Sequence, residues 1–521
     1  MQVPRDADHL LVRGEQMAQL EQQLFASGLP VEALMEKAAL GISQHLLSHH
    51  NLTAGALVLV GPGHNGGDGL VVARELHLAG LQVRIWSPFE RHKPLTASHL
   101  AHARWLGIPV LDQAPDPTDP ALWIDGLLGI GQRQAPTEAI QQLLLNRQRD
   151  RPWQLVAIDV PTGLCADRGI PLAHGVATAH TTLTLGLVKT GLVQDSALAH
   201  VGSLVRIDLG LPARLLDALP AQQPLGLTAR DRAATATTSG TANGTSAATG
   251  KPITGNPAAS KYQRGRLLVV AGSDRYRGAA ALALAGASSS GCGSLRAALP
   301  APMGQGLWQQ MPHVVVSQEL PCKASGDLDL TALAPEHLER LDTLLVGPGI
   351  GSSPDPAADP SWRQLQTFEG LLVLDADGLN RLARLAETAT GWLQQRQGPT
   401  WITPHRGEFD RLFPTWAKLD PLDAARQAAQ TTGASVVLKG ARSVVSSPDG
   451  RCWQLMEANP QAARAGLGDV LAGYAAGRGA MDGGDGAILA AAALDHAVAG
   501  CQSPHPTPQM VASQLALDRN G

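Results

Sequence analysis

Cysteine is scarce in this sequence of 521 residues, and its five cysteines stand far apart, at Cys165, Cys292, Cys322, Cys452 and Cys501. No C-x-x-C pair occurs among them, and no group of His and Cys has the spacing of zinc ligands. This scarcity excludes a zinc site of that kind and indicates a reducing compartment.

Two other features are missing: an excess of charge of one sign and a long apolar run. With 41 Lys and Arg against 45 Asp and Glu, the formal net charge is -4, which favours neither nucleic acid nor an anionic membrane surface as partner. The most apolar stretch, residues 487–500, is interrupted by Asp495 and His496, so it is too short to span a bilayer. The first residues are polar and acidic, unlike a signal peptide. We predict a soluble cytoplasmic protein that binds a small molecule.

Domain boundaries follow from length and composition. A chain of this length is expected to form two to four domains. Residues from 228 to about 260 are rich in Thr, Ala, Gly and Ser, and such a tract cannot repay the entropy of ordering. We predict a first domain at 1–227, a flexible linker at 228–259 and a second domain at 260–521.

Apolar runs alternate with helical patterns on both sides of the linker. Continuous apolar strands separated by helices are typical of a parallel sheet covered on both faces, so two α/β domains in series are predicted. The predicted strands are 56–60, 82–86, 122–125, 155–160, 181–185 and 204–207 before the linker, and 266–270, 343–346, 371–374, 400–402 and 435–438 after it.

The stretch GPGHNGGDG, residues 61–69, lies between a predicted strand and a helical pattern. Its Gly61-x-Gly63-x-x-Gly66 spacing is that of a dinucleotide fingerprint. A dinucleotide fold also needs an acidic residue at the end of its second strand, and here the nearest acid is Glu90, beyond a proline. The fingerprint alone therefore does not establish a dehydrogenase.

Polar residues near these glycines are more informative. Asn65 and Asp68 add directed hydrogen bonds or oxygen ligands for a hard cation, although turn residues that bond their own backbone explain the segment equally well. Asp125 and Asp159 each end a predicted strand before a glycine-rich turn. Because the carboxyl ends of parallel strands share one edge, we expect Asn65, Asp125, Asp159 and Thr162 to converge on one pocket.

These segments resemble the N-terminal domain of the bifunctional NAD(P)H-hydrate repair enzymes, a Rossmann-like three-layer epimerase that interconverts the R and S forms of hydrated NADH and NADPH. The resemblance is carried by LMEKA (34–38), GPGHNGGDGLVVAREL, DGLLGIG, AIDVPTGLCADRG, TLTLGLVKTGL and VGSLVRIDLGLP. It implies that Asp159 is the acid/base, although a carboxylate there also fits a cap of the following turn. It further implies K⁺ ligands at Asn65, Asp125 and Thr162, with phosphates wrapped by 129–135. The implied substrate contacts are His64, Asn65, Gly66, Gly67, Asp68, Gly129, Ile130, Gly131, Gln132, Arg133, Gln134, Ala135 and Asp159.

Three positions depart from this family pattern. His64 stands where Asn is usual, Thr162 where Ser is usual and Cys165 where Asp is usual. Thr162 keeps the hydroxyl group, whereas the other two change the chemistry of the predicted substrate contacts.

In the second half, AGLGDVLAGYAAG (465–477) combines a glycine-rich turn with the start of a helix and Asp469. Backbone N–H groups at a helix N-terminus bind anions, and an adjacent carboxylate can take a proton from a hydroxyl group that attacks phosphorus. A simple N-cap explains Asp469 as well. Lys439 and His405 each follow a predicted strand, on the edge expected to bind ligand. For His405 we favour a binding role over a structural one.

These segments resemble the C-terminal domain of the same family, a ribokinase-like dehydratase that uses ADP, or ATP in eukaryotic relatives, to restore the cofactor from the S hydrate. The matching pieces are SKYQRGRLLVVAGSDRYRGAAALA, VGPGIG, VLDADGLN, TPHRGEF, VVLKGARS, NPQAARAGLGDVLAG and LDHAVAG. The resemblance implies Asp469 as base, Mg²⁺ on the phosphates, and hydrate contacts at Gly349, His405 and Asp469. It implies nucleotide contacts at Lys439, Gly440, Ala441, Arg442, Ser443 and Gly468. Leu467, Ser260, Ala462 and Ser443 depart from the usual Thr, His, Met and Thr.

Two alternatives stay open at this stage. One is a ribokinase-like small-molecule kinase fused to an α/β nucleotide-binding domain, which would also use Asp469 as base. The other is a nucleotide sensor without catalysis, for which Asn65, Asp125, Asp159 and His405 would be unnecessary. We also expect a homo-oligomer, with neither nucleic acid nor membrane as partner.

Overall fold

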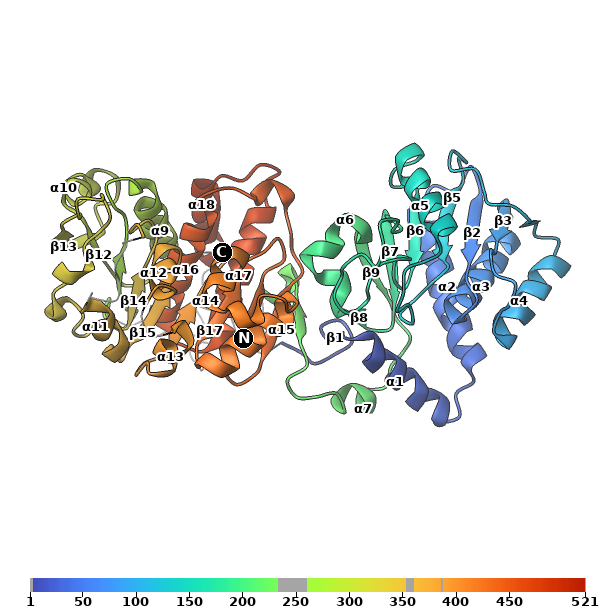
Figure 1. Ribbon diagram of the computed structural model, residues 1–521, viewed down its shortest axis with the longest axis horizontal. Coiled ribbons are helices and arrows are strands. Elements are labelled where there is room, and N and C mark those ends of the chain that lie inside the picture. Colours follow the sequence, from blue (N-terminus) through green and yellow to red (C-terminus); the bar gives the residue numbers. More distant parts are fainter. Residues whose placement is uncertain (1–2, 233–259, 353–359, 386–387, 521) are drawn as a thin grey trace, which may run out of the picture. The chain divides into compact units, whose positions relative to one another are not determined.

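The computed structural model describes residues 3–232, 260–352, 360–385 and 388–520. Its contacts divide the chain into two compact units. The N-terminal unit spans Arg5–Gln223, and the C-terminal unit begins at Pro224 and also takes in Val3 and Pro4. Each unit is built around its own sheet (Figure 1).

The main sheet of the N-terminal unit has seven strands, all parallel, in the order β4-β3-β2-β5-β6-β7-β9. The chain leaves β2 toward one edge and returns beside it as β5, and ligands bind at such a switch point in open α/β sheets. The strands are β2 (Ala56–Val60), β3 (Val83–Trp86), β4 (Val110–Leu111), β5 (Leu122–Gly126), β6 (Leu155–Ile158), β7 (Thr181–Leu185) and β9 (Ser203–Ile207). A separate parallel pair joins β1 (Leu11–Val12) to β8 (Val188–Lys189).

Helices cover both faces of this sheet because alternate residues of its strands are buried on opposite sides. Leu57 and Leu59 belong to a core cluster with Ile140 and Leu144 of α5. Helix α3 packs on β2 and β5 and against α2. The helices of the unit are α1 (Gly14–Ala26), α2 (Val31–His49), α3 (His64–Leu78), α4 (Pro94–Trp105), α5 (Glu138–Asp150), α6 (Leu198–Val201) and α7 (Ala213–Asp217).

The C-terminal unit contains a ten-stranded sheet in the order β10-β19-β18-β17-β16-β15-β14-β11-β12-β13. Every neighbouring pair is parallel except β17 with β18 and β18 with β19. The strands are β10 (Leu225–Leu227), β11 (Arg266–Val270), β12 (Ser294–Pro300), β13 (Val315–Leu320), β14 (Thr343–Val346), β15 (Leu371–Leu374), β16 (Thr400–Ile402), β17 (Ser435–Leu438), β18 (Val444–Ser446) and β19 (Cys452–Leu455).

Two core clusters lie on the two faces of this sheet. Leu267 and Val269 of β11 face α9, α16, α17 and α18, whereas Leu268 and Val270 face the cluster that includes α11 and α13 to α15. This alternation along one strand is the two-residue period of a sheet covered on both faces. The helices are α9 (Arg277–Ser289), α10 (Ala301–Gln310), α11 (Ser361–Thr367), α12 (Asp377–Leu382), α13 (Ala389–Gln394), α14 (Arg406–Leu412), α15 (Pro421–Thr432), α16 (Leu467–Asp482), α17 (Gly486–Cys501) and α18 (Pro508–Asn520).

The boundary between the units lies before the predicted linker. Strand β10 pairs with β19, so residues 225–227, which we assigned to the first domain, belong to the sheet of the C-terminal unit. Residues 228–232, at the start of the predicted linker, are held by a Thr228–Asp231 capping box and by ion pairs of Arg232 with Asp495 and Asp518. The rest of the predicted linker, 233–259, lies outside the described residues.

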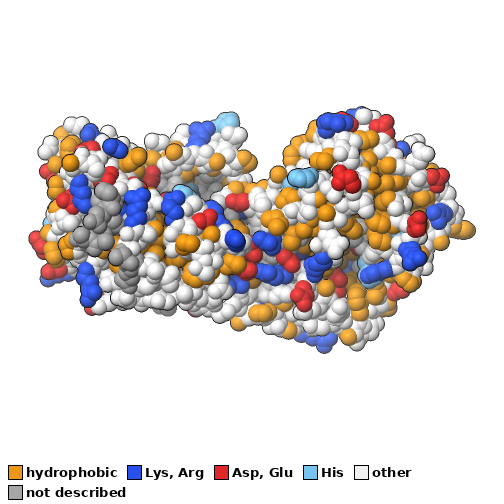
Figure 2. All heavy atoms as spheres, viewed as in Figure 1, with side chains coloured by type: hydrophobic (Ala, Val, Ile, Leu, Met, Phe, Trp, Pro, Cys, Tyr) orange, Lys and Arg blue, Asp and Glu red, His pale blue; other side chains and the backbone are white. Residues whose placement is uncertain are grey.

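The two predicted α/β domains with parallel strands are confirmed. All eleven predicted strands are present, seven of them with the predicted bounds (β2, β7, β11, β14, β15, β16 and β17). Basic and acidic side chains are interspersed on the face shown in Figure 2. Among the described residues, no helix is both long and apolar enough to cross a membrane.

Candidate active sites

The glycines of the fingerprint let three backbone segments meet at the switch point. A Cβ atom on Gly66 would overlap the carbonyl oxygen of Gly61, and one on Gly61 would overlap that of Leu127. Helix α3 begins inside the motif, at His64, so Asn65 and Asp68 lie in its first two turns. The glycines therefore bring the start of α3 against the end of β5.

Asp125 and Thr162 form a buried pair at the ends of β5 and β6. The Thr162 hydroxyl donates to Asp125 Oδ1 and its backbone N–H donates to Oδ2, both at 2.8 Å, while Leu127 N–H also donates to Oδ1. Both side chains have no exposed surface. Burial raises the pKa of Asp125 to about 6, although these hydrogen bonds favour its ionised form.

Asn65 lies beside the same loop. Its side-chain amide packs against Gly129, and its backbone carbonyl lies against Gly126. The amide nitrogen of Asn65 is buried without a hydrogen-bond partner. In the adjacent loop, Leu128 N–H donates to the Thr162 hydroxyl. Residues 126–129 thus connect the three predicted K⁺ ligands.

Asp159 follows β6 with a left-handed backbone, at φ 65°, and its carboxylate points to a lysine that the sequence analysis did not select. Lys189 Nζ lies 2.5 Å from Asp159 Oδ1 and also donates to the Thr184 hydroxyl and to the Leu185 carbonyl. Lys189 has no exposed surface and Asp159 is 6% exposed. The Lys189 side chain is thus held beside Asp159 by three acceptors.

Two further carboxyl groups belong to this cluster. Asp68 of α3 is buried, and its pKa is raised well above its usual range by burial and by the nearby charges of Asp159 and Glu21. Glu21 of α1 is half-buried, and burial and Asp159 raise its pKa to about 7 while Lys189 opposes the rise. Lys189 lies in the quoted motif TLTLGLVKTGL, whereas nothing in the periodicity of α1 singles out Glu21.

The predicted phosphate-wrapping segment borders a cavity of about 380 Å³, lined by Phe89, Leu128, Gln132, Arg133, Gln134, Ala135, Pro136, Thr137 and Ile140. Gln132 also has a structural role, because its amide donates to the Pro161 carbonyl and accepts from Gly163 N–H. His64 and Arg133 are exposed. The structure therefore joins this segment to the Thr162 turn, while Asn65, Asp125 and Asp159 do not line this cavity.

In the C-terminal unit, an ion pair connects the ends of β15 and β17. Lys439 Nζ lies 2.7 Å from Oδ1 of Asp375, which also accepts from the Thr403 hydroxyl at 2.7 Å. Asp375 is 1% exposed. Asp375 directly follows a predicted strand, and Asp125 ends one. The pattern that selected Asp125, a carboxylate at the end of a predicted strand, was therefore present here too.

Asp469 lies in the first turn of α16, beside Lys439. A Cβ atom on Gly468 would lie 3.2 Å from Lys439 Nζ. The pKa of Asp469 is raised to about 7, first by burial and then by Asp375; Asp377 and Glu408 add to the rise and Lys439 opposes it. Gly349 lies in the loop after β14, where Gly351 N–H donates to Asp377. These groups meet at the carboxyl edge of β14 to β17.

His405 has the structural role that was the alternative for it. Its Nδ1 accepts from Gly407 and Glu408 N–H, while Glu408 accepts from His405 N–H, which forms a capping box for α14. Its side chain is nevertheless 56% exposed and lines a cavity of the unit. The cap fixes the ring, and its Nε2 lies 3.4 Å from Oε1 of Glu408.

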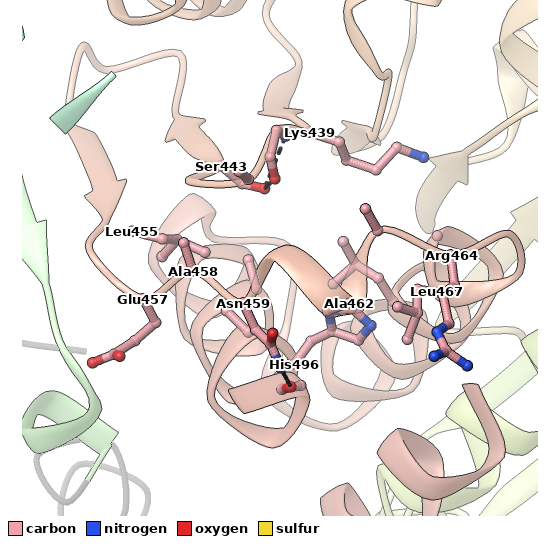
Figure 3. A pocket seen from close by; sticks show the side chains of 18 of the residues that line it. Lys439, Ser443, Leu455, Glu457, Ala458, Asn459, Ala462, Arg464, Leu467 and His496 are labelled. Carbon is pink, nitrogen blue, oxygen red and sulfur yellow. Dashed lines mark hydrogen bonds between the residues drawn. The ribbon is translucent and has the colours of Figure 1, made fainter. Parts of the chain in front are cut away.

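This cavity encloses about 560 Å³ between the 439–443 turn and residues 455–468, with α17 beside it. In Figure 3, Lys439 and Ser443 line one side while Asn459, Ala462 and His496 line the other. All predicted nucleotide contacts except Arg442 line this cavity. Leu467 lines it as well, yet its side chain is 7% exposed and belongs to a core cluster. Leu467 therefore packs into the core despite its size.

Among the described residues, no group of three or more His, Cys, Asp or Glu side chains is arranged to hold a metal ion. Residues 267–516 match the family described as NAD(P)H-hydrate dehydratase, and residues 31–191 match the YjeF-related protein N-terminus.

Two similar proteins are both called bifunctional NAD(P)H-hydrate repair enzyme. One, from Synechocystis, is 38% identical over 470 residues, which cover 90% of this chain and 85% of the relative. The other, from Gloeobacter violaceus, is 40% identical over 469 residues, which cover 89% and 87%.

Two solved structures each resemble about half of this chain. A ribokinase-like superfamily protein from Enterococcus faecalis is 20% identical, with a TM-score of 0.42, covering 51% of this chain and 90% of that one. An ADP/ATP-dependent NAD(P)H-hydrate dehydratase from Bacillus subtilis, co-crystallized with ATP/Mg²⁺, is 23% identical, with a TM-score of 0.41, covering 51% and 93%.

Proposed function

This chain belongs to the family of the bifunctional NAD(P)H-hydrate repair enzymes, and from that premise we propose how its two activities divide between its two units. The family assignment decides against the kinase and sensor hypotheses. We assign epimerisation to the N-terminal unit with Asp159 as acid/base, and ADP-dependent dehydration to the C-terminal unit with Asp469 as base.

The observation that supports Asp159 is its pairing with Lys189. Epimerisation requires the hydroxyl group beside the ring nitrogen to leave one face and to return on the other, so a group must give and take a proton. Lys189 Nζ lies 2.5 Å from the Asp159 carboxylate and orients it, and a carboxylate so placed can accept a proton from water. The left-handed backbone at Asp159 directs this carboxylate toward Lys189 rather than into a cap of the following turn.

The N-terminal unit also fits K⁺. Asp125 is a buried carboxylate whose hydrogen bonds come from backbone N–H groups and one hydroxyl, with no cationic side chain paired to it in the described residues. A bound cation would supply the missing positive charge, and oxygen atoms of Asn65, Asp125 and Thr162 are suitable ligands for a hard ion. When bound, K⁺ supplies positive charge near the dinucleotide phosphates. His64–Asp68 and Gly129–Ala135 contact the dinucleotide.

In the C-terminal unit, Asp469 takes the proton of the ring hydroxyl as that oxygen attacks the terminal phosphorus of ADP and AMP leaves. The phosphate group then departs with its bonding electrons, assisted by the ring nitrogen, and loss of a proton from the neighbouring ring carbon restores the reduced nicotinamide. Gly468 and the start of α16 hold phosphate through backbone N–H groups. Lys439–Ser443 line the adenylate site, and Gly349 with His405 holds the hydrate.

Charge at this site fits a divalent cation. The carboxyl groups of Asp375, Asp377 and Glu408 all raise the pKa of Asp469, whereas Lys439 is the only cation among the groups that shift it. Mg²⁺ held mainly by the phosphates of ADP would offset this excess of negative charge. The cation would neutralise charge on the transferred phosphate group.

Exchange of single carboxylates tests the division. We expect Asp159→Asn to abolish interconversion of the R and S hydrates and to spare ADP-dependent dehydration of the S form, and Asp469→Asn to do the reverse. Interconversion is followed by chromatography without ADP, and dehydration by the absorbance of the reduced nicotinamide. Loss of both activities from either change would contradict the two-site assignment. Replacing K⁺ by Na⁺ should slow only the interconversion.

A homo-oligomer and a cytoplasmic location, both expected from the sequence, complete the proposal. Light scattering on the purified full chain measures the first, and cell fractionation measures the second.

A further inference from the structure

The cluster around Asp159 contains a second carboxyl group placed for catalysis, on a segment outside every motif that carries the family resemblance. Glu21 lies on α1, one turn after Met17 on the same helix face. A Cβ atom on Gly186 would lie 2.6 Å from the terminal methyl of Met17. Gly186 follows Leu185, whose backbone binds both Asp159 and Lys189. Met17 of α1 thus packs beside the backbone segment that binds Asp159 and Lys189.

The strand before α1 fixes this position. Strand β1 pairs in parallel with β8, and Val12 is the register partner of Lys189. At the start of the helix, Gly14 N–H donates to Asp167 at 2.6 Å. Two independent attachments therefore hold α1 in place, and Glu21 is a fixed neighbour of the cluster.

Charge balance then separates the roles of the carboxyl groups. Lys189 is hydrogen-bonded to Asp159 and also lowers the pKa of Glu21, whereas Asp159 and Glu21 both raise the pKa of Asp68. Asp68 and Asp159 are 7% and 6% exposed, whereas Glu21 keeps more of its surface. Asp159 contacts Lys189 directly, whereas burial raises the pKa of Glu21 to about 7 and also raises the pKa of Asp68. Of these two, Glu21 is the more accessible to a substrate.

We propose that Glu21 is a second catalytic residue of the epimerase, the acid that protonates the departing ring hydroxyl. The proposal rests on the assignment of Asp159 above. The carbon–oxygen bond breaks with its electron pair on oxygen, the Glu21 proton completes a water molecule, and the nitrogen lone pair forms a carbon–nitrogen double bond. Water then adds to the opposite face, its oxygen forms the new bond, and Asp159 takes its proton. Proton transfer from Asp159 to Glu21 through solvent restores the starting state.

Two carboxyl groups can supply a proton donor and a proton acceptor at the same time, which one carboxylate cannot. Departure on one face and return on the other require proton donors and acceptors on both sides of the ring. The raised pKa of Glu21, about 7, suits an acid that works near neutral pH, while Asp159 is held by its contact with Lys189. The charged groups that act on Glu21 are Asp159 and Lys189, and Glu21 in turn raises the pKa of Asp68.

The test is the pH dependence of interconversion by the full chain, measured without ADP from the pure R hydrate. We expect the kcat of Glu21→Gln to fall by about 10²-fold or more with little change in KM, as for loss of a general acid. In the unmodified protein kcat should decline above about pH 7 as Glu21 ionises, and Glu21→Gln should lack that decline. Glu21→Asp, which keeps a carboxyl group, should recover part of the rate.

Glu15→Gln is the matched control, because Glu15 is exposed on the same helix. Dehydration of the S hydrate with ADP shows that the C-terminal unit of each variant is folded, and a melting curve shows whether the N-terminal unit is folded. If Glu21→Gln matches Glu15→Gln while Asp159→Asn is inactive, the Glu21 proposal is wrong and the Asp159 assignment stands. If Asp159→Asn is fully active, the proposed function itself fails. If Glu21→Gln unfolds, a wild-type profile without a decline near pH 7 overturns the proposal.

Discussion

The Asp469 carboxylate is needed for dehydration but lowers the stability of the C-terminal unit. This carboxyl group is held among Asp375, Asp377 and Glu408, and its pKa is raised from 3.8 to about 7. The folded state therefore binds this proton more tightly than the unfolded state does. The resulting penalty on folding is fully present above the folded pKa and disappears as the pH falls toward the unfolded pKa. We expect Asp469→Asn, which cannot ionise, to abolish dehydration and to stabilise the C-terminal unit.

The magnitude follows from the shift. A change of about 3 pKa units corresponds to about 4 kcal/mol in the free energy of unfolding, at 1.36 kcal/mol per unit. Asp469 keeps partial contact with solvent, which screens the interaction, so we expect a gain of about 1–3 kcal/mol at pH 8. For a unit of this size, that gain raises the melting temperature by about 2–4 °C per kcal/mol.

Scanning calorimetry of the full chain between pH 4.5 and pH 8 measures this gain. The transition of the C-terminal unit is identified as the one that ADP shifts upward. The advantage of Asp469→Asn should shrink as the pH falls. Glu339→Gln, at an exposed carboxylate of the same unit, should show no such trend. Equal or lower stability of Asp469→Asn at pH 8 would refute the reasoning, since it would mean that the carboxylate is not under electrostatic strain.

Three further predictions concern other parts of the chain. Lys439→Met should lower the free energy of unfolding, measured by urea denaturation, by about 3–5 kcal/mol, because it leaves the Asp375 carboxylate buried without its cation. The double variant Lys439→Met/Asp375→Asn should recover most of this loss. Gly66→Ala, whose new Cβ would overlap the Gly61 carbonyl, should destabilise the N-terminal unit by about 1–3 kcal/mol and slow only the epimerisation; an unchanged melting temperature would contradict this. Burial and neighbouring histidines lower the pKa of His50 from 6.5 to about 4. The folded state therefore favours neutral His50, and the free energy of unfolding falls as the pH drops below 6.5. Between pH 7 and pH 5, wild type should lose about 1–2 kcal/mol more of this free energy than His50→Gln.

Local sequence determined most of the architecture of this protein. Apolar runs such as Ala56–Val60 and Leu371–Leu374 are buried on both faces of a sheet, and a run of that kind is recognisable without knowledge of its neighbours. The edge strand β13 was not predicted, because its exposed and half-buried residues follow no such run. Strand β10 was missed because it has three residues and its pairing with β19 depends on a segment more than two hundred residues away.

The candidate sites divide in the same way. Residues that end a strand, such as Asp125, Asp159 and Lys439, were found because parallel strands place their carboxyl ends at one edge. Lys189 contacts Asp159 from β8, and Glu21 lies on α1, which the β1–β8 pairing brings near this cluster. The sequence by itself determined the family, the strands and the edge on which the chemistry lies. Tertiary structure alone decided which carboxyl group has a cation beside it and which retains a proton, because protonation depends on burial and on charges brought together from distant segments.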